Sequence, residues 1–442
     1  MLRRSIVALL ISSLVPLALA TQATGEVTPA LGRYIVVLKS PAASGSLAEA
    51  ASGLGGTVNG VFSSLNGLLV TLPLLNLNSL LRDPRVAYVV PDRPVRLLAE
   101  PAPAGVGRIG AGPRVNPDGS VFSTADPKAA VAIVDTGISP HPELNVVGGV
   151  NCASDPLGGL LGGLLGGGGA SEPDEGGDYT DSHGHGTHVA GTVGAKADGN
   201  GVVGVSPGAP LYAVKVFGTL GTGALSDVIC GLDWVAANAV AKNIKVVNMS
   251  LGGDGADDES CGVESKDPFH EAVCGVVAQG VTVVVAAGNS HVDLVESVPA
   301  AYDEVLTVTA MADFDGLPGG QAEASCKTKD VDDTAADFSN FTLPDSPDAA
   351  HTVAAPGVCV NSTWNDGGYE TISGTSMASP HVAGLVARCI DAGPCSGLTP
   401  ADIIGKIRTD AAARPAGTGF FGDTKMPLDG RYYGDLVDAS TY

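Results

Sequence analysis

The chain has 442 residues and a formal net charge of −23 at pH 7, which arises from 47 acidic and 24 basic side chains. This length accommodates one large domain and a smaller one, and the 44% of hydrophobic residues is enough for a sizeable core. The acidic balance argues against a nucleic-acid partner, because such partners require a basic surface. Residues 1–98 carry 8 basic and 4 acidic side chains, so nearly all of the acidity lies beyond them.

The N-terminus has the pattern of an export signal. Arg3 and Arg4 precede an apolar run over residues 6–19, and Ala18-Leu19-Ala20 is typical of a signal cleavage site. No later apolar run is long and unbroken enough to span a bilayer. We therefore predict a signal peptide over residues 1–20 and a secreted, extracellular protein with no membrane partner.

Residues 21–98 have a pattern of their own. Apolar periodicity predicts one strand over residues 33–39, two within 57–72 and one over 86–92, with helices near 47–52 and 74–82. This β-α-β-β-α-β order is that of a ferredoxin-like α+β domain.

Residues 99–442 alternate short apolar runs with helical stretches. Apolar runs without polar alternation indicate strands that are buried on both faces, and hence a mostly parallel sheet covered by helices. Three polar residues fall at the carboxyl ends of such runs, where the active sites of open α/β sheets gather. The runs end at Asp135, Phe217, Leu251, Asn289 and Met311, and the three polar residues are Asp135, Ser250 and Asn289.

The eight cysteines follow the predicted leader, and export makes disulfides possible. Eight cysteines allow 105 pairings. Among these we favour the two local pairs Cys261–Cys274 and Cys389–Cys395.

Three segments resemble insertions. Residues 157–169 are rich in Gly and Leu and predict a mobile surface loop. Residues 255–267 and 327–337 are acidic, and the sequence leaves open whether they are only solvated or hold a metal ion.

Three motifs supply an acid, a base and a hydroxyl in that order. They are AIVDTGI around Asp135, HGHGTHVAGT around His185 and SGTSMASPH around Ser376. A serine hydroxyl is a poor nucleophile near neutral pH, so it needs an adjacent base, and the base needs an acid to orient it. The helix predicted to begin at Ser376 would add the positive end of its dipole. In AAGN, the Asn289 amide could donate to an oxyanion beside the backbone N–H of Ser376.

At these motifs the chain resembles the subtilisin-like serine proteases (subtilase family, peptidase S8), which share the Asp, His, Ser order. The resemblance runs from about Arg33 to about Asp438. It implies an α/β fold, a subtilisin-like three-layer sandwich, over residues 99–442, and a serine endopeptidase that acts through an acyl-enzyme. Residues 21–98 resemble the inhibitor propeptide (I9 type) of such enzymes. This implies an autoprocessed zymogen whose own propeptide is a chaperone and temporary inhibitor, cut near residues 98–102.

The resemblance also implies a substrate-binding strand and a specificity pocket. Ser297 and Val298 would set the depth of the pocket, and because both are uncharged we expect a broad, apolar-leaning preference for protein and peptide substrates. Glu296 beside them leaves a basic preference open. The strand would pair with an extended peptide. The implied substrate-binding residues are Ser250, Leu251, Gly252, Gly253, Ala287 and Gly288.

Calcium is the one cofactor that the resemblance implies, in a structural role and with no organic cofactor. The ligands would be the Asp198 side chain and three carbonyls, all from the segment KADGNGV, together with Glu143, where the family usually has Asp. Hard oxygen donors suit this ion. The three carbonyls belong to Lys196, Asn200 and Val202.

Two other classes of protein compete with this interpretation. A catalytically dead homologue would only bind peptides, but all four catalytic residues are present. A zinc hydrolase could use His183, His185 and His188, yet the glutamate base of such sites is missing. In a eukaryotic host, Asn340 and Asn361 would be glycosylation acceptors, and Asn248 is discounted because its strand is buried. We expect a monomer.

Overall fold

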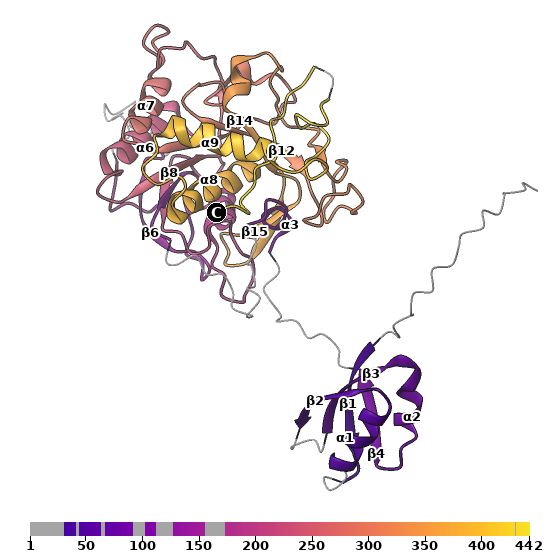
Figure 1. Cartoon of the computed structure of the whole chain (residues 1–442). Helices are drawn as coiled ribbons and strands as arrows, with labels where there is room; N and C mark the ends of the chain where they lie inside the picture. The colour runs from indigo at the N-terminus through magenta and orange to yellow at the C-terminus, as the bar shows by residue number, and fades with distance from the viewer. Residues whose placement is uncertain are drawn as a thin grey trace, which may run out of the picture. The chain divides into compact units, whose positions relative to one another are not determined.

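The computed structural model describes residues 31–40, 44–62, 67–91, 102–111, 127–154, 173–428 and 430–442. The chain divides into two compact units, Met1–Leu97 and Leu98–Tyr442 (Figure 1). The predicted signal peptide, the Gly/Leu-rich segment 157–169 and most of the predicted cleavage segment lie outside the described residues. No helix among the described residues is both long and apolar enough to cross a membrane.

The first unit is a four-stranded antiparallel sheet with strand order β2-β3-β1-β4. Its elements follow the β-α-β-β-α-β order expected from the sequence, and buried side chains such as Val36, Leu47 and Leu72 give it a core of its own. The elements are β1 (Leu31–Leu38), α1 (Ser44–Gly53), β2 (Thr57–Phe62), β3 (Gly67–Pro73), η3 (Leu74–Asn76), α2 (Leu77–Leu81) and β4 (Val86–Pro91).

The second unit is built on an eight-stranded sheet in the order β13-β12-β10-β8-β5-β7-β6, with β14 also paired to β12. All pairs are parallel except the edge pair of β12 with β13. All five predicted apolar runs are strands of this sheet, which confirms the α/β prediction. The strands are β5 (Ala130–Asp135), β6 (Val146–Asn151), β7 (Leu211–Lys215), β8 (Ile244–Met249), β10 (Thr282–Ala286), β12 (Leu306–Ala312), β13 (Thr334–Ala335) and β14 (Thr352–Pro356).

Helices cover both faces of this sheet and make three layers. On β5, Val131 and Ile133 pack with α5 (His185–Gly194), α8 (Thr375–Ala392) and α9 (Pro400–Ala412) in one buried cluster. Ala132 and Val134, on the opposite face, pack with α6 (Leu225–Asn238) and α7 (Pro268–Val277) in another. A strand that faces apolar layers on both sides has no polar alternation, which is why these runs could be recognised in the sequence.

Several short elements lie outside the main sheet and its covering helices. The strand pair β9–β11 is antiparallel, as is the hairpin β15–β16. Four disulfides are present, and two of them are the predicted local pairs. The bonds are Cys152–Cys230, Cys261–Cys274, Cys326–Cys359 and Cys389–Cys395. The short elements are α3 (Ala104–Arg108), β9 (Gly253–Asp254), η4 (Leu294–Glu296), β11 (Ser297–Val298), η5 (Pro347–His351), β15 (Val360–Thr363) and β16 (Tyr369–Ile372).

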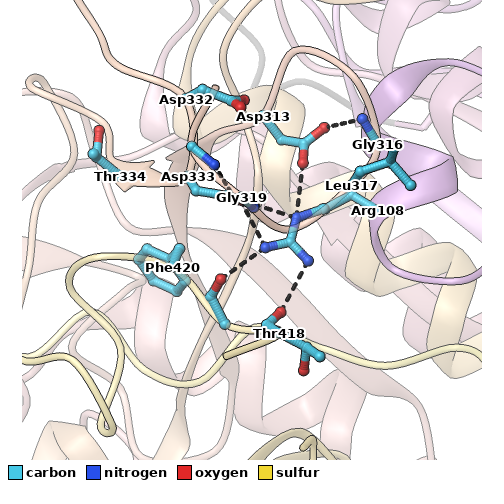
Figure 2. Close-up of polar contacts among 12 residues, drawn as sticks. Arg108, Asp313, Gly316, Leu317, Gly319, Asp332, Asp333, Thr334, Thr418 and Phe420 are labelled. Carbon is cyan, nitrogen blue, oxygen red and sulfur yellow. Dashed lines mark hydrogen bonds and ion pairs between the residues drawn. The ribbon is translucent and has the colours of Figure 1, made fainter. Parts of the chain in front are cut away.

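A buried arginine attaches α3 to the body of the second unit (Figure 2). The Arg108 guanidinium lies 2.7 Å from a carboxylate oxygen of Asp313 and 2.7 Å from one of Asp333. It also donates to the carbonyls of Thr418 (2.9 Å) and Gly419 (2.7 Å). Part of the acidic segment 327–337 therefore points inward, and Arg108 supplies the positive charge beside it.

We predict that Arg108→Met lowers the free energy of unfolding by about 3–5 kcal/mol, because it leaves Asp313 buried without its cation. The double variant Arg108→Met, Asp313→Leu should lose less, since it removes the uncompensated charge as well. Chemical denaturation of the inhibited enzyme measures both, with the exposed Lys128→Met as control. Equal stability of Arg108→Met and Lys128→Met would contradict the prediction.

Candidate active site

The end of β5 and the start of α5 bring an acid and a base together. Asp135 is fully buried, and Thr136 N donates to one of its oxygens at 2.7 Å. His185 Nδ1 lies 2.8 and 3.0 Å from the two carboxylate oxygens of Asp135. Because a carboxylate only accepts hydrogen bonds, Nδ1 carries the proton and Nε2 is left with its lone pair.

A second buried carboxylate, Asp181, fixes this junction. It accepts from Thr136 Oγ1 (2.9 Å), Thr187 Oγ1 (2.7 Å) and the N–H groups of His183 and Gly184 (2.9 and 2.8 Å). The turn after Asp135 and the first turn of α5 are thereby tied to one side chain. Our sequence reasoning missed Asp181, although an acid just before a helix start is a capping signal.

The geometry does not support the zinc interpretation of the three histidines. His188 is fully buried, its Nε2 lies 3.0 Å from the Val360 carbonyl, and burial lowers its pKa to about 4. His185 Nδ1 is committed to Asp135. Among the described residues, the groups of side chains close enough to share a metal ion do not include these histidines.

Ser376 is the second residue of α8 and lies beside the end of β8. Its hydroxyl donates to the Ser250 carbonyl at 3.3 Å, and the Ser250 hydroxyl donates to the Ser376 carbonyl at 2.8 Å. Rotation about the Cα–Cβ bond would release the Ser376 hydroxyl from this carbonyl. Catalytic hydrogen bonds of ligand-free enzymes are often long or misaligned in this way.

The orientation of the Asn289 amide is fixed. Its carbonyl oxygen accepts from Thr375 N (2.8 Å) and Thr375 Oγ1 (2.9 Å), so the NH₂ group is turned away from these donors. Asn289 and Ser376 line the same pocket. The preceding Gly288 has φ +103°, and a Cβ there would lie 2.5 Å from the side chain of Asn340, so only glycine fits.

This pocket has a volume of about 370 Å³ and collects the residues predicted to bind substrate. Ser297 and Val298 also line it, together with Asp254 and Asn340, which the sequence reasoning did not include. A second pocket of about 520 Å³ shares the wall Leu251–Asp254 with the first pocket, and it is also lined by Leu225, Val228 and Phe269. The predicted residues in the first pocket are Ser250, Leu251, Gly252, Gly253, Ala287 and Gly288.

Asn340 holds the pocket together, and its prediction as a glycosylation acceptor is wrong. It is 2% exposed, and its amide nitrogen donates to the Ala287 carbonyl (2.9 Å) and Ser297 Oγ (3.2 Å). A nitrogen used in this way cannot carry a glycan. Asn248 is buried as expected, whereas Asn361 is exposed in β15.

Glu143 lies against the predicted calcium loop. It is 2% exposed, one carboxylate oxygen accepts from the Tyr369 hydroxyl, and the other accepts from Val202 N at 3.1 Å. Asp198 is exposed and accepts from Asn200 N at 3.1 Å within the loop. Lys196 N donates to the Glu143 carbonyl at 3.0 Å. Tyr369, on the β15–β16 hairpin, was not anticipated as a partner of Glu143.

Residues 126–425 match the sequence profile of the Subtilase family. The chain belongs to that family. It is 33% identical over 369 residues to subtilisin E of Bacillus subtilis (strain 168), covering 82% of this chain and 81% of that protein. It is 34% identical over 326 residues to the M-protease of Shouchella clausii (strain KSM-K16), with coverage of 74% and 69%.

Solved structures agree with the sequence comparisons. The chain resembles the crystal structure of a cold adapted subtilisin-like serine proteinase, with a TM-score of 0.52 and 29% identity over 76% of this chain and 98% of that one. The predicted subtilisin-like α/β fold is thereby confirmed, and the protein is a serine-type endopeptidase.

We predict that the acid limb of the pH profile of kcat/KM lies above pH 6.5, the ordinary pKa of histidine. Burial lowers the pKa of His185, but the Asp135 carboxylate more than offsets this, so the pKa is raised and the base is still protonated at pH 6.5. Asp135→Asn should move the limb to lower pH and reduce kcat by about 10,000-fold, as the equivalent change does in a trypsin-type triad. Asp178→Asn, which alters an exposed acid in the neighbouring loop, serves as control. An unchanged limb in Asp135→Asn would contradict this assignment.

Proposed function

We propose that the protein is a secreted endopeptidase, made as an autoprocessed zymogen, that hydrolyses peptide bonds with Asp135, His185 and Ser376. In this mechanism, His185 Nε2 takes the proton of the Ser376 hydroxyl as the oxygen attacks the scissile carbonyl. Asp135 holds the imidazole in the required tautomer and stabilises the imidazolium. The observation that carries the proposal is the pair of short contacts between His185 Nδ1 and Asp135.

The Asn289 amide and the Ser376 backbone N–H then hold the oxyanion of the tetrahedral intermediate. Support comes from Thr375, which donates two hydrogen bonds to the side-chain carbonyl of Asn289 and so directs the NH₂ group of that amide toward the pocket. Such a donor is worth about 100- to 1,000-fold in kcat, a figure that was measured in subtilisin. His185 returns its proton to the leaving amine, and water releases the acyl-enzyme.

We further propose that residues Ser250–Gly253 bind an extended peptide by backbone pairing and that specificity is broad and leans toward apolar side chains. The mainly uncharged linings of the two adjoining pockets support this preference. Asp254 contributes one exposed carboxylate to both linings, and it is the one charged residue in the lining of the first pocket, so basic side chains are not repelled there.

We propose that residues 21–98 are the propeptide, and all of this range except Leu98 belongs to the first unit. It has its own core and sheet, as a folding chaperone and temporary inhibitor would need. A segment that is cut by the enzyme itself must remain attached when the nucleophile is removed.

We predict that intact mass will separate wild type from Ser376→Ala. Wild type should lose the mass of a segment that begins at residue 1 and ends between about residues 98 and 102. It should also carry one fluorophosphonate label on Ser376. Ser376→Ala should be secreted folded, unlabelled and with residues 21–98 attached. Normal maturation of Ser376→Ala would contradict the autoprocessing proposal. An unlabelled, unprocessed wild type would contradict the assignment of Ser376 as the nucleophile.

We also propose a structural Ca²⁺ at the loop of residues 196–202. The donor set fits the ion, because it consists of hard oxygens: the Asp198 and Glu143 carboxylates and the carbonyls of Lys196, Asn200 and Val202. A cation there competes with the Tyr369 hydroxyl for one oxygen of Glu143, since that oxygen accepts from Tyr369 in this structure.

We therefore predict that Tyr369→Phe raises the affinity for Ca²⁺ by about tenfold, the equivalent of the one hydrogen bond of about 1–1.5 kcal/mol that the ion no longer displaces. Asp198→Asn should lower the affinity. Calcium titrations of the melting temperature measure both, with the exposed Asp366→Asn as a control on the same hairpin loop. Identical calcium dependence in wild type, Tyr369→Phe and Asp198→Asn would rule out this loop.

A further inference from the structure

A histidine and three carboxylates meet where the acidic segment 255–267 joins α7. His270, in the first turn of α7, is 1% exposed, and its ring is stacked on that of Tyr302 with centroids 3.8 Å apart. Its Nε2 lies 2.8 Å from a carboxylate oxygen of Glu304. An ionised carboxylate only accepts, so this contact places the ring proton on Nε2.

The other ring nitrogen has no hydrogen-bond partner. His270 Nδ1 is buried, and it faces Asp258 Oδ1 at 3.4 Å and Asp257 Oδ1 at 3.5 Å. In the neutral ring with its proton on Nε2, Nδ1 presents a lone pair to two acceptor oxygens. A buried acceptor that faces other acceptors is costly unless a positive charge, either a second ring proton or a metal ion, lies between them.

We propose that Asp257, Asp258 and His270 form a binding site for a divalent transition metal ion of the Zn²⁺ type. Tetrahedral zinc with bonds of about 2.0–2.1 Å to nitrogen and oxygen sets its ligand atoms about 3.4 Å apart. The distances from Nδ1 to the two carboxylate oxygens match this spacing. Imidazole nitrogen favours such an ion over Ca²⁺ or Mg²⁺, which prefer oxygen.

The surroundings of the three ligands are those of a metal site. Glu304 stands behind His270 as the carboxylate that commonly orients a metal-binding histidine. The N–H of Ser265 and that of Gly262 donate to the Asp258 carboxylate at 2.8 and 2.9 Å and hold its pKa well below its usual range. Asp257 and Asp258 are 14% and 11% exposed, which leaves an open side for water as a fourth ligand.

Two cysteines lie close to the same histidine but are not ligands here. Cys261 and Cys274 have side chains near His270 and Glu304, yet they are bonded to each other. A thiolate ligand requires a free cysteine. The disulfide instead joins the acidic segment to α7 beside the proposed site.

The proposed metal site lies beside the second pocket and would stabilise one of its walls. Gly255 and Ser265–Phe269, at the two ends of the acidic segment, line that pocket. A metal ion held by Asp257, Asp258 and His270 would link the segment to α7 and fix this wall. The proposal is independent of the proteolytic mechanism, because none of its residues belongs to the triad.

The test uses the full chain treated with a serine-directed phosphonate, freed of metals with EDTA, and dialysed into excess Ca²⁺ so that oxygen-only sites are filled. Co²⁺ and Zn²⁺ are then titrated, with visible absorption of Co²⁺ and metal analysis as readouts. We expect one site per chain with the spectrum of tetrahedral Co²⁺. Glu304→Gln should weaken binding by about 10- to 100-fold, and Asp257→Asn should weaken it further.

Glu264→Gln is the matched control, because this exposed acid lies on the same segment outside the cluster. Melting curves without metal identify any variant that is simply misfolded. Among the folded variants of this segment, Asp257→Asn should lose the metal-induced rise in melting temperature, whereas Glu264→Gln should keep it. The proposal is overturned if wild type binds no Co²⁺, if Asp257→Asn binds it as wild type does, or if an intense cobalt–thiolate band places the metal on Cys261 and Cys274.

Discussion

The geometry of the proposed active site depends on the burial of α8, the helix that carries Ser376. Every side chain from Thr375 to Cys389 is buried except that of Ser376, and the helix packs against β8, β10, β12 and α5. The position of Ser376 is therefore set by the core and not by a loop. Thr375 and Ser250 connect this helix end to Asn289 and to the proposed substrate-binding strand. One packed helix thus positions Ser376 and Asn289, the proposed nucleophile and oxyanion donor, together.

The remaining half of the site depends on two buried carboxylates with different tasks. Asp135 contacts the imidazole, whereas Asp181 accepts from the turn after Asp135 and from the first turn of α5. Each would be costly to bury without partners. Because backbone N–H and hydroxyl donors satisfy Asp181, the strand end and the helix start are held at a fixed separation. We infer that the acid–base pair is assembled by folding, before any substrate arrives.

The sequence predicted those features that depend on local pattern. Apolar runs without alternation predicted the strands, and two of the three motifs supplied Asp135 and His185, which the structure places in contact. The catalytic roles of these two residues and of Ser376 are our proposal. Side chains whose partners are remote in sequence escaped it: Tyr369 meets Glu143 across 226 residues, and Asn340 reaches Ala287 across 53. Asn340 shows the difficulty most clearly, because its local pattern is that of a glycosylation acceptor while its contacts make it a support of the pocket.

Acidic composition likewise does not reveal how each carboxylate is stabilised, and three environments in this molecule differ in kind. Glu143 is buried against a tyrosine hydroxyl and a backbone N–H, so neutral donors carry its charge. Asp313 and Asp333 share the guanidinium of Arg108, an internal cation. Asp257 and Asp258 face a ring nitrogen that has no hydrogen-bond partner, while Glu304 contacts the nitrogen on the other side of the ring. In this third environment backbone N–H groups stabilise Asp258, and the metal ion that we propose adds a positive charge between Asp257, Asp258 and His270 Nδ1. The proposal therefore follows from the arrangement of these groups and not from the acidity of the segment.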